Sequence, residues 1–508
     1  MLLRNTIWNL LGEGLPMAAA LLSIPWMIAT IGLEHFGFLT LIWALLGYLS
    51  LLDLGLVRSL VQILAERRSR LDGAGDIGIA GPALGVMAVL GLVTGGVVVA
   101  AAGPLTDYVL HTPGAAAGEI RTSLMIVGLI VPVALVSAAL RGMLEAYQQF
   151  RPVNLVRMVV GVMNYLSPLC VLPFSGSLVW IIAAIAFGRV LGLLAFGWLC
   201  LRVMPDLLSP SRYPRVPLRP LFRMGGWMML NNLTGPVMVY GDRFILASLV
   251  PAATVVFYTT TLEVLSRLLF IPGALSAVLF PIVAGLFARN PQALGRILTA
   301  GGYAIFGVFL VVQAAVVVSG GAALELWLGP TFAAQGGPIL AVLALGVLFN
   351  AVAFVPHALI QGIGRVDVTA KLQLIELPVY LGVLWALVAL YGPMGAAIAW
   401  SLRTGADLLL LLLMLPTLAP NTRSAAVTIG WTVGLSGAAV ALGLAIGGET
   451  GAAVRFFAVA GSIVTVGSRL LKLRHEDGMR WLWQRCSPVA ARYFLPSAVP
   501  GAGDHAGR

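Results

Sequence analysis

The hydrophobic positions of this chain gather into long runs that are separated by short polar breaks. Most runs reach about 20 residues, the length at which a helix crosses a hydrocarbon core of about 30 Å. The runs do not alternate between polar and apolar residues, as the strands of a membrane barrel do. The pattern predicts about fourteen transmembrane helices, at residues 6–31, 37–63, 77–102, 122–145, 152–173, 177–201, 223–249, 254–287, 297–319, 338–360, 371–391, 393–418, 426–447 and 452–471.

The composition agrees with an all-α polytopic membrane protein. The chain has 508 residues, of which 59% are hydrophobic and 10% are charged, against about a quarter charged in soluble domains. The breaks carry residues that favour turns, as at Ser175-Gly176-Ser177, Tyr391-Gly392-Pro393 and Gly447-Gly448. We therefore expect the spans to be joined by short connections.

A repeated pattern suggests that the protein contains two related halves. Arg4 and Trp8 near the start have the same spacing as Arg223 and Trp227, and a proline follows each pair. Parallel repeats of this kind occur in transporters. The predicted organisation is an N-terminal six-helix bundle (1–203), a cytoplasmic linker (204–222), a C-terminal six-helix bundle (223–420), two additional helices (421–472) and a basic, aromatic tail (473–508).

The positions of the basic residues predict the orientation in the membrane. Arg and Lys concentrate in alternate connections, and such residues mark the cytoplasmic side. Both termini are then cytoplasmic. The same signal accounts for the net charge of +11, so we expect membrane lipids and no nucleic acid as partners. Arg243, near an external helix end, is predicted to anchor its helix at the membrane surface.

Charged residues deep inside the predicted spans carry the strongest functional signal. A charge at the bilayer centre costs at least about 2.5–3.5 kcal/mol, so it usually faces a bundle interior or an aqueous pathway. Glu263 with Arg267, and Arg403 with Asp407, are four residues apart and can pair along one helix face. The seven deep charges are Glu13, Asp53, Arg189, Glu263, Arg267, Arg403 and Asp407.

No sequence motif indicates an enzyme or a cofactor. The chain has no GxSxG, HExxH or P-loop pattern, and its three cysteines lack metal-binding spacing. Gly362-Ile363-Gly364-Arg365 follows a membrane helix without the rest of a dinucleotide fingerprint, so it is predicted to be a loop. We expect no metal site and no catalytic residues.

Three stretches resemble one family of membrane transporters. They are Arg4-Asn5-Thr6-Ile7-Trp8-Asn9 with Gly37-Phe38-Leu39, then Leu52-Asp53-Leu54-Gly55-Leu56, and Gln361 to Arg365 with Glu376-Leu377-Pro378 and Trp400-Ser401-Leu402-Arg403. Together they resemble Wzx-type polysaccharide flippases of the multidrug/oligosaccharidyl-lipid/polysaccharide exporter superfamily. The resemblance covers roughly residues 1–470.

This resemblance implies a fold and a cargo. It implies two six-helix bundles in a V-shaped arrangement that move a polyprenyl-pyrophosphate-linked oligosaccharide across the bacterial inner membrane by alternating access. Arg189, Arg267 and Arg403 are then the candidates for pyrophosphate binding, because guanidinium pairs well with phosphate oxygens.

The resemblance also implies an energy source and partner proteins. Glu13, Asp53 and Asp407 are the candidates for coupling transport to H⁺ or Na⁺. A polysaccharide polymerase and chain-length machinery are candidate partners.

Three alternatives remain open at the level of sequence. A cation-coupled multidrug exporter of the same superfamily would need a cavity dominated by carboxylates and aromatic side chains, whereas the three deep arginines favour anionic cargo. A polysaccharide polymerase or ligase needs external catalytic loops, whereas the predicted external connections are short. A scaffold without transport does not explain deep charges that have no local partner.

Overall fold

The chain divides into two compact units. The computed structural model describes residues 2–49, 56–57, 60–61, 64, 73–109, 115–147, 149–205, 238, 241–287 and 290–475. One unit contains residues 3–260 and 373–396, and the other contains residues 261–372 and 397–508. Most of the predicted linker and most of the predicted tail lie outside the described residues, so the predicted bundle boundaries stay predictions.

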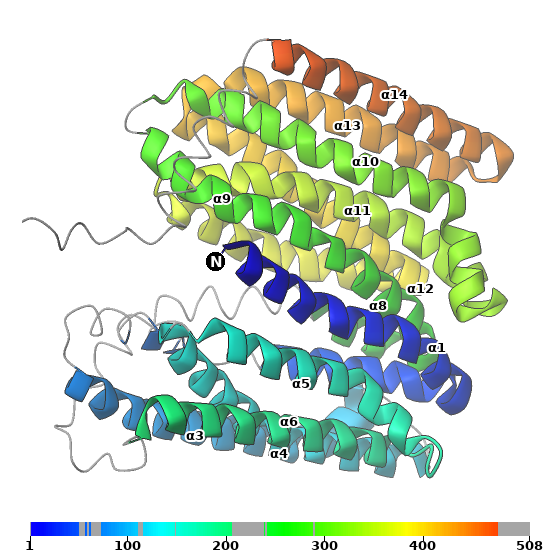
Figure 1. Cartoon of the computed structure of the whole chain (residues 1–508). Helices are drawn as coiled ribbons and strands as arrows, with labels where there is room; N and C mark the ends of the chain where they lie inside the picture. The colour runs from blue at the N-terminus through cyan, green and yellow to red at the C-terminus, as the bar shows by residue number, and fades with distance from the viewer. Residues whose placement is uncertain are drawn as a thin grey trace, which may run out of the picture. The chain divides into compact units, whose positions relative to one another are not determined.

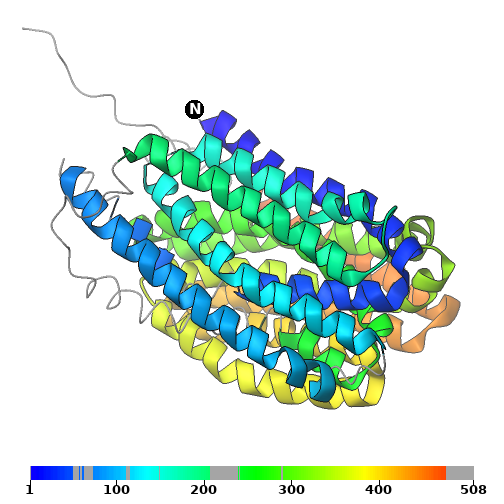
Figure 2. The same ribbon diagram turned by 90° about the horizontal axis from the view of Figure 1, so that it is seen from below.

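Four neighbouring helices form most of the first unit. α3 packs on α4, α4 packs on α6, and α5 packs on α6, as Figures 1 and 2 show from two directions. The helices of this unit, with the π-helical turn that ends α3, are α1 (Leu2–Leu49), α3 (Gly73–Pro104), η1 (Leu105–Val109), α4 (Ala115–Ala146), α5 (Phe150–Val171) and α6 (Leu178–Val203).

The second unit is also helical, and α10 and α11 form its most extensive described contact. α9 packs on α11, and α14 packs on both α10 and α13. α8 begins in the first unit and continues into the second. The remaining elements are α8 (Ala252–Ser266), η4 (Arg267–Leu269), α9 (Phe270–Phe287), α10 (Ala293–Leu328), α11 (Pro330–Gly362), α12 (Val366–Leu418), η5 (Pro420–Thr422), α13 (Arg423–Ile446) and α14 (Gly448–His475).

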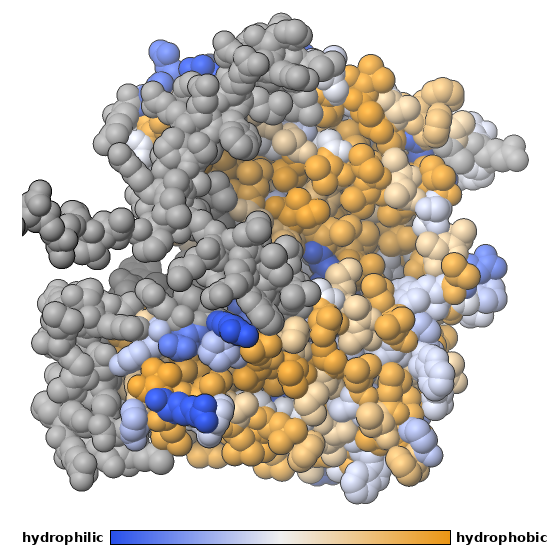
Figure 3. Space-filling view, in the orientation of Figure 1, coloured by the Kyte–Doolittle hydropathy of each residue, from blue (hydrophilic) through white to orange (hydrophobic). Residues whose placement is uncertain are grey.

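The described helices confirm a multi-pass membrane protein. Ten of them are long and apolar enough to cross a membrane, and the space-filling view is dominated by apolar side chains (Figure 3). Two of them are far longer than one crossing requires. The 53 residues of α12, for example, would span about 80 Å at 1.5 Å per residue if the helix were straight. The predicted number of fourteen spans stays a prediction.

A glycine interrupts each of these two long helices. Gly32 in α1 has φ 78° and Gly392 in α12 has φ 57°, a region that favours glycine because it has no Cβ atom. α1 turns back on itself at this point (Figure 1). The sequence places breaks at the same two positions, so both predicted helix ends are confirmed.

The start of α6 is held by a carboxylate from α4. The Glu119 side chain accepts hydrogen bonds from the Ser177 hydroxyl (2.6 Å) and from the Leu178 backbone N–H. His35 lies 3.5 Å from the other carboxylate oxygen. An acceptor with negative charge satisfies the open N–H groups of a helix start and interacts favourably with its dipole. This contact sets the position of α6 against α4.

Small residues allow α3 and α4 to approach closely. A Cβ atom at Gly91 would lie 2.5 Å from the Cα of Pro132, and one at Gly95 would overlap the carbonyl oxygen of Gly128. Membrane helices often associate through such small residues, because lipid offers no hydrophobic gain for packing apolar side chains. The α3–α4 contact therefore depends on glycine at these positions.

Gly95→Ala is expected to destabilise the protein by about 1–3 kcal/mol, because the added methyl group must displace the α4 backbone. Gly96→Ala is the matched control, since a Cβ atom at Gly96 meets nothing within 4 Å. Unfolding of both purified variants in detergent measures the difference. Equal stability of the two variants would contradict the close packing of α3 on α4.

Candidate functional site

The deep charges differ in how the structure uses them. Glu263 and Arg267 form an ion pair four residues apart in the second unit, and each side chain is more than a third exposed (38% and 37%). Arg267 also begins η4, a turn of 3₁₀ helix between α8 and α9. Glu263 therefore neutralises Arg267 along its own chain segment, at a point where the helix changes its geometry.

Arg403 and Asp407 lie one turn apart in α12, and their charges interact. Both residues are half-buried. Thr404, beside them, donates a hydrogen bond from its hydroxyl to the carbonyl oxygen of Gly346 in α11 (3.0 Å), and Ser401 donates to that of Val342 (2.9 Å). These bonds fix this part of α12 against α11, so the two charges stand on a rigid element.

Arg189 occupies the middle of the buried face of α6. Ile182, Ile185 and Phe196 are buried at helical spacing on either side of it. Its Nε atom is buried, and none of the described residues accepts a hydrogen bond from that atom. A buried donor atom without an acceptor is costly. The Nε–H group of Arg189, on a side chain that is half-buried overall, is thus a donor that the described residues leave unused.

Two of the predicted coupling residues, Glu13 and Asp53, cannot be placed relative to Arg189. Glu13 lies in α1, and its side chain is outside what the structure describes, as is the whole of Asp53. The structure thus brings no predicted carboxylate to Arg189 among the described residues. The roles predicted for Glu13 and Asp53 stay predictions.

A buried polar cluster in the first unit was missed by the sequence reasoning. Asp242 is fully buried and accepts hydrogen bonds from the Tyr258 hydroxyl and from the Arg243 backbone N–H (2.7 Å). The Tyr380 ring is also buried and interacts electrostatically with Tyr258. The cluster joins the segment before α8 with α8 and α12. It places a carboxylate, a guanidinium and two phenols within one apolar unit.

The position of Arg243 corrects a sequence-based prediction. Arg243 is 6% exposed, so it is buried and does not anchor its helix at the membrane surface. Arg243 lies only about two helical turns, about 10 Å, before Val250, and this nearness to the helix end misled the prediction. The useful signal was the pair of adjacent opposite charges, Asp242-Arg243, in an apolar run.

Gln313 is a second polar group that the sequence reasoning missed. It lies in α10 with 1% of its surface exposed, and neither its Nε2 nor its Oε1 atom has a hydrogen-bond partner among the described residues. Most buried polar groups have such partners. Gln313 therefore offers an amide donor and acceptor inside the second unit.

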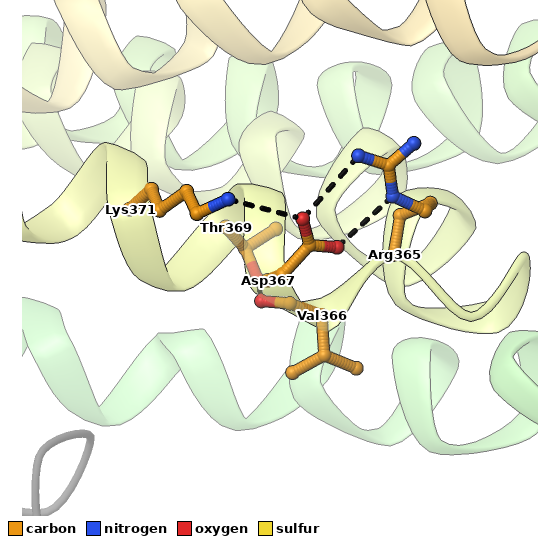
Figure 4. Close-up of polar contacts among 5 residues, drawn as sticks. All are labelled: Arg365, Val366, Asp367, Thr369 and Lys371. Atoms are coloured by element: carbon orange, nitrogen blue, oxygen red, sulfur yellow. Dashed lines mark hydrogen bonds and ion pairs between the residues drawn. The ribbon is translucent and has the colours of Figure 1, made fainter.

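The predicted loop is confirmed at Ile363 to Arg365, whereas Gly362 is the last residue of α11. The charges at the loop are satisfied locally (Figure 4). Arg365 donates two hydrogen bonds to Asp367, from Nε (2.9 Å) and Nη2 (3.3 Å), and Lys371 lies 3.5 Å from the same carboxylate. The bonds to Asp367 raise the pKa of Arg365. Asp367 lies in the first turn of α12, where a negative charge interacts favourably with the helix dipole. These exposed residues stabilise a helix start.

The fold and the buried charges define a class of protein: an all-α, multi-pass membrane protein that holds charged groups inside its helical units. The chain belongs to the family described as polysaccharide biosynthesis protein, which matches residues 2–287. A candidate O-antigen transporter of Shigella flexneri is 29% identical over 426 residues, which cover 81% of this chain and 96% of the relative.

Two solved structures share the fold. An inward-facing multidrug resistance MATE family transporter of the MOP superfamily superposes with a TM-score of 0.70 at 16% identity, over 83% of this chain and 96% of its own. The lipid II flippase MurJ, in an inward closed conformation, superposes with a TM-score of 0.66 at 11% identity, over 93% and 99%. The superfamily resemblance and exporter-type fold expected from the sequence are confirmed.

Tyr258→Phe is expected to cost about 1.5–3 kcal/mol of stability, because it removes a hydrogen bond to a buried carboxylate. Tyr303→Phe is the matched control. Tyr303 is equally buried, but its hydroxyl contacts the neutral hydroxyl of Thr432 (3.2 Å), so about 0.5–1.5 kcal/mol is expected there. Denaturant unfolding of the purified variants measures both values. A Tyr258 variant no less stable than the Tyr303 variant would show that Asp242 does not depend on this phenol.

Proposed function

We propose that this protein flips a polyprenyl-pyrophosphate-linked oligosaccharide across the bacterial inner membrane by alternating access, for cell-surface or exopolysaccharide synthesis. Family membership supports polysaccharide biosynthesis as the process. The relative named for O-antigen transport and the fold shared with a lipid II flippase support a lipid-linked glycan as the cargo. Both termini are proposed to be cytoplasmic, from the distribution of basic residues.

Arg189 is the observation that carries the choice of an anionic cargo. Its side chain is half-buried on α6, and none of the described residues accepts a hydrogen bond from its buried Nε atom. A pyrophosphate supplies the acceptor oxygens that such a guanidinium lacks. Arg267 and Arg403 have acidic neighbours on their own helices, so we assign them a secondary part in binding the cargo.

Coupling to H⁺ or Na⁺ is part of the proposal. Asp407, with Glu13 and Asp53, keeps the role expected from the sequence, and Asp242 joins these residues because it is a fully buried carboxylate with a phenol donor. A buried ionisable residue inside a membrane helix commonly marks an ion pathway. A polysaccharide polymerase and chain-length machinery are the proposed partners downstream of transport.

A multidrug exporter is the second candidate, favoured by the fold shared with a MATE transporter. A drug exporter for cationic compounds needs carboxylates and aromatic side chains in its binding site, and Asp242 with Tyr258 and Tyr380 provides them. Arg189 opposes such cargo. A polymerase or ligase has less support, because the connections between α5 and α6 and between α10 and α11, which are external in the predicted orientation, are only a few residues long.

Arg189→Gln is expected to reduce transport at least tenfold, because the loss of a charged hydrogen bond of about 1.5–3 kcal/mol corresponds to a factor of ten or more. The measurement is flipping of a fluorescent polyprenyl-pyrophosphate-linked oligosaccharide in vesicles that contain the purified protein. Arg189→Lys, which keeps the charge, is expected to retain part of the activity.

Arg202→Gln is the matched control on the same helix. Arg202 is exposed at the end of α6, and its guanidinium lies over the Trp198 ring at 3.7 Å. The rate of flipping is therefore expected to stay close to that of the unchanged protein. Normal flipping by Arg189→Gln would exclude the pyrophosphate role. Active export of cationic drugs by the same vesicles, without flipping, would favour the second candidate.

Asp242→Asn is expected to abolish the dependence of flipping on an imposed H⁺ or Na⁺ gradient, because the amide cannot gain or lose a proton or neutralise a cation. Asp367→Asn, the same change at an exposed carboxylate, is expected to leave that dependence unchanged. The same vesicles, with gradients imposed one at a time, provide the measurement. A gradient response that survives in Asp242→Asn would remove this residue from coupling.

A further inference from the structure

The second unit contains a polar cavity that the proposed transport cycle does not use. Its volume is about 340 Å³, and it lies at the ends of α10, α13 and α14. Such a volume is at the lower end of the range for small-molecule sites, about 300–1,000 Å³. It therefore suits a compact group such as a phosphate ester and is too small for a chain of sugars.

One face of α10 forms a wall of the cavity. Gln292, Arg296, Thr299 and Tyr303 all line it, and their spacing of four, three and four residues places them along one side of the helix. Tyr303 is buried, and its hydroxyl lies 3.2 Å from that of Thr432 in α13. This wall therefore carries the exposed guanidinium of Arg296 and, about two helical turns further along α10, the buried ring of Tyr303.

α13 and α14 complete the lining with polar groups. Asn421, Ser424 and Thr428 come from the start of α13 and the turn before it, and Arg469 comes from the last part of α14. A Cβ atom at Gly295 would lie 2.6 Å from the Asn421 carbonyl oxygen, so the backbones of α10 and η5 approach closely here. None of the described residues that line the cavity is acidic.

The electrostatics of this cavity favour an anion. Two guanidinium groups, Arg296 and Arg469, belong to the lining. α10 and α13 both begin at the cavity; their first backbone N–H groups, at Ala293, Leu294 and Arg423, donate to backbone carbonyl oxygens just before them, so the helix starts contribute through their dipoles. Helix starts carry partial positive charge, which adds to that of the arginines. Guanidinium and amide donors together match the oxygens of a phosphate.

An apolar surface continues directly from the polar lining. Ser424, Thr428, Trp431 and Leu435 follow one side of α13 at spacings of four, three and four residues. The first two line the cavity, whereas Trp431 and Leu435 are 66% and 64% exposed. A ligand that lies along this side of α13 would therefore contact the polar lining at one end and the exposed apolar side chains of Trp431 and Leu435 about two to three helical turns away. A ligand with a phosphate head and an acyl tail fits both parts.

We propose that this cavity binds the phosphate group of an anionic phospholipid, with the headgroup between Arg296 and Arg469 and an acyl chain along Trp431 and Leu435. The predicted orientation puts the site in the cytoplasmic leaflet. All its lining residues belong to the second unit and Arg189 belongs to the first, so we assign the cavity a resident lipid and not the cargo. Binding there joins α10, α13 and α14 at one end and stabilises the second unit.

The test uses the full-length protein in detergent and follows its thermal unfolding midpoint as ligand is added. The ligands are dioctanoyl phosphatidylglycerol, dioctanoyl phosphatidylcholine and inorganic phosphate. Phosphatidylglycerol is expected to raise the midpoint in a saturable way, and the other two ligands to have little effect at equal concentration. An equal rise with inorganic phosphate would overturn the lipid assignment, because it would identify a site for soluble phosphate.

Two variants test the location of the site. Arg296→Gln combined with Arg469→Gln is expected to weaken the apparent affinity for phosphatidylglycerol at least tenfold, and Ser424→Phe, which fills the mouth without changing the charge, is expected to do the same. Arg151→Gln combined with Arg202→Gln removes two exposed arginines of the first unit and is expected to change the affinity less than twofold.

Unchanged affinity in the arginine double variant and in Ser424→Phe would overturn the proposal, as would an equal loss in the control. Arg189→Gln is expected to bind phosphatidylglycerol normally. The lipid site and the proposed transport function can therefore fail independently of each other.

Discussion

The fold depends on one constraint, which is that hydrocarbon offers no hydrogen bonds to a polar group. Helices satisfy their own backbones, and many hydroxyls do the same by donating to a carbonyl oxygen one turn earlier. Thr30, Thr122 and Ser137 make such bonds at 2.8, 2.8 and 2.6 Å. Against this background, a polar side chain that is not satisfied locally is informative. Arg189 and Gln313 are such side chains among the described residues.

The same constraint explains what could be read from the sequence. The apolar runs predict the helices because each run must cover a full crossing, and the breaks at Gly32 and Gly392 are visible because only glycine tolerates the backbone there. The contact between Glu263 and Arg267 follows from their spacing alone. Arg189 could be recognised as a deep charge because no acidic residue lies within one turn of it.

The remaining parts of the site depend on contacts between segments distant in sequence. Asp242 meets Tyr258 sixteen residues later across a turn between helices, and Tyr380 belongs to another helix altogether. The polar cavity needs residues from α10, α13 and α14, which extend over Gln292 to Arg469. The spacing of residues along one helix does not indicate which other helix will pack against it. These groupings therefore became visible only in three dimensions.

The short turn η4 places a change of helical geometry between α8 and α9. Its three residues, Arg267 to Leu269, advance about 120° each in 3₁₀ geometry but about 100° each in α geometry. Conversion of this turn to α-helix would rotate α9 by about 60° about its own axis and shorten the segment by about 1.5 Å. The face that α9 presents to α11 would then change without any break in the chain. Such a conversion would begin at the Glu263–Arg267 ion pair, since Arg267 is the first residue of η4.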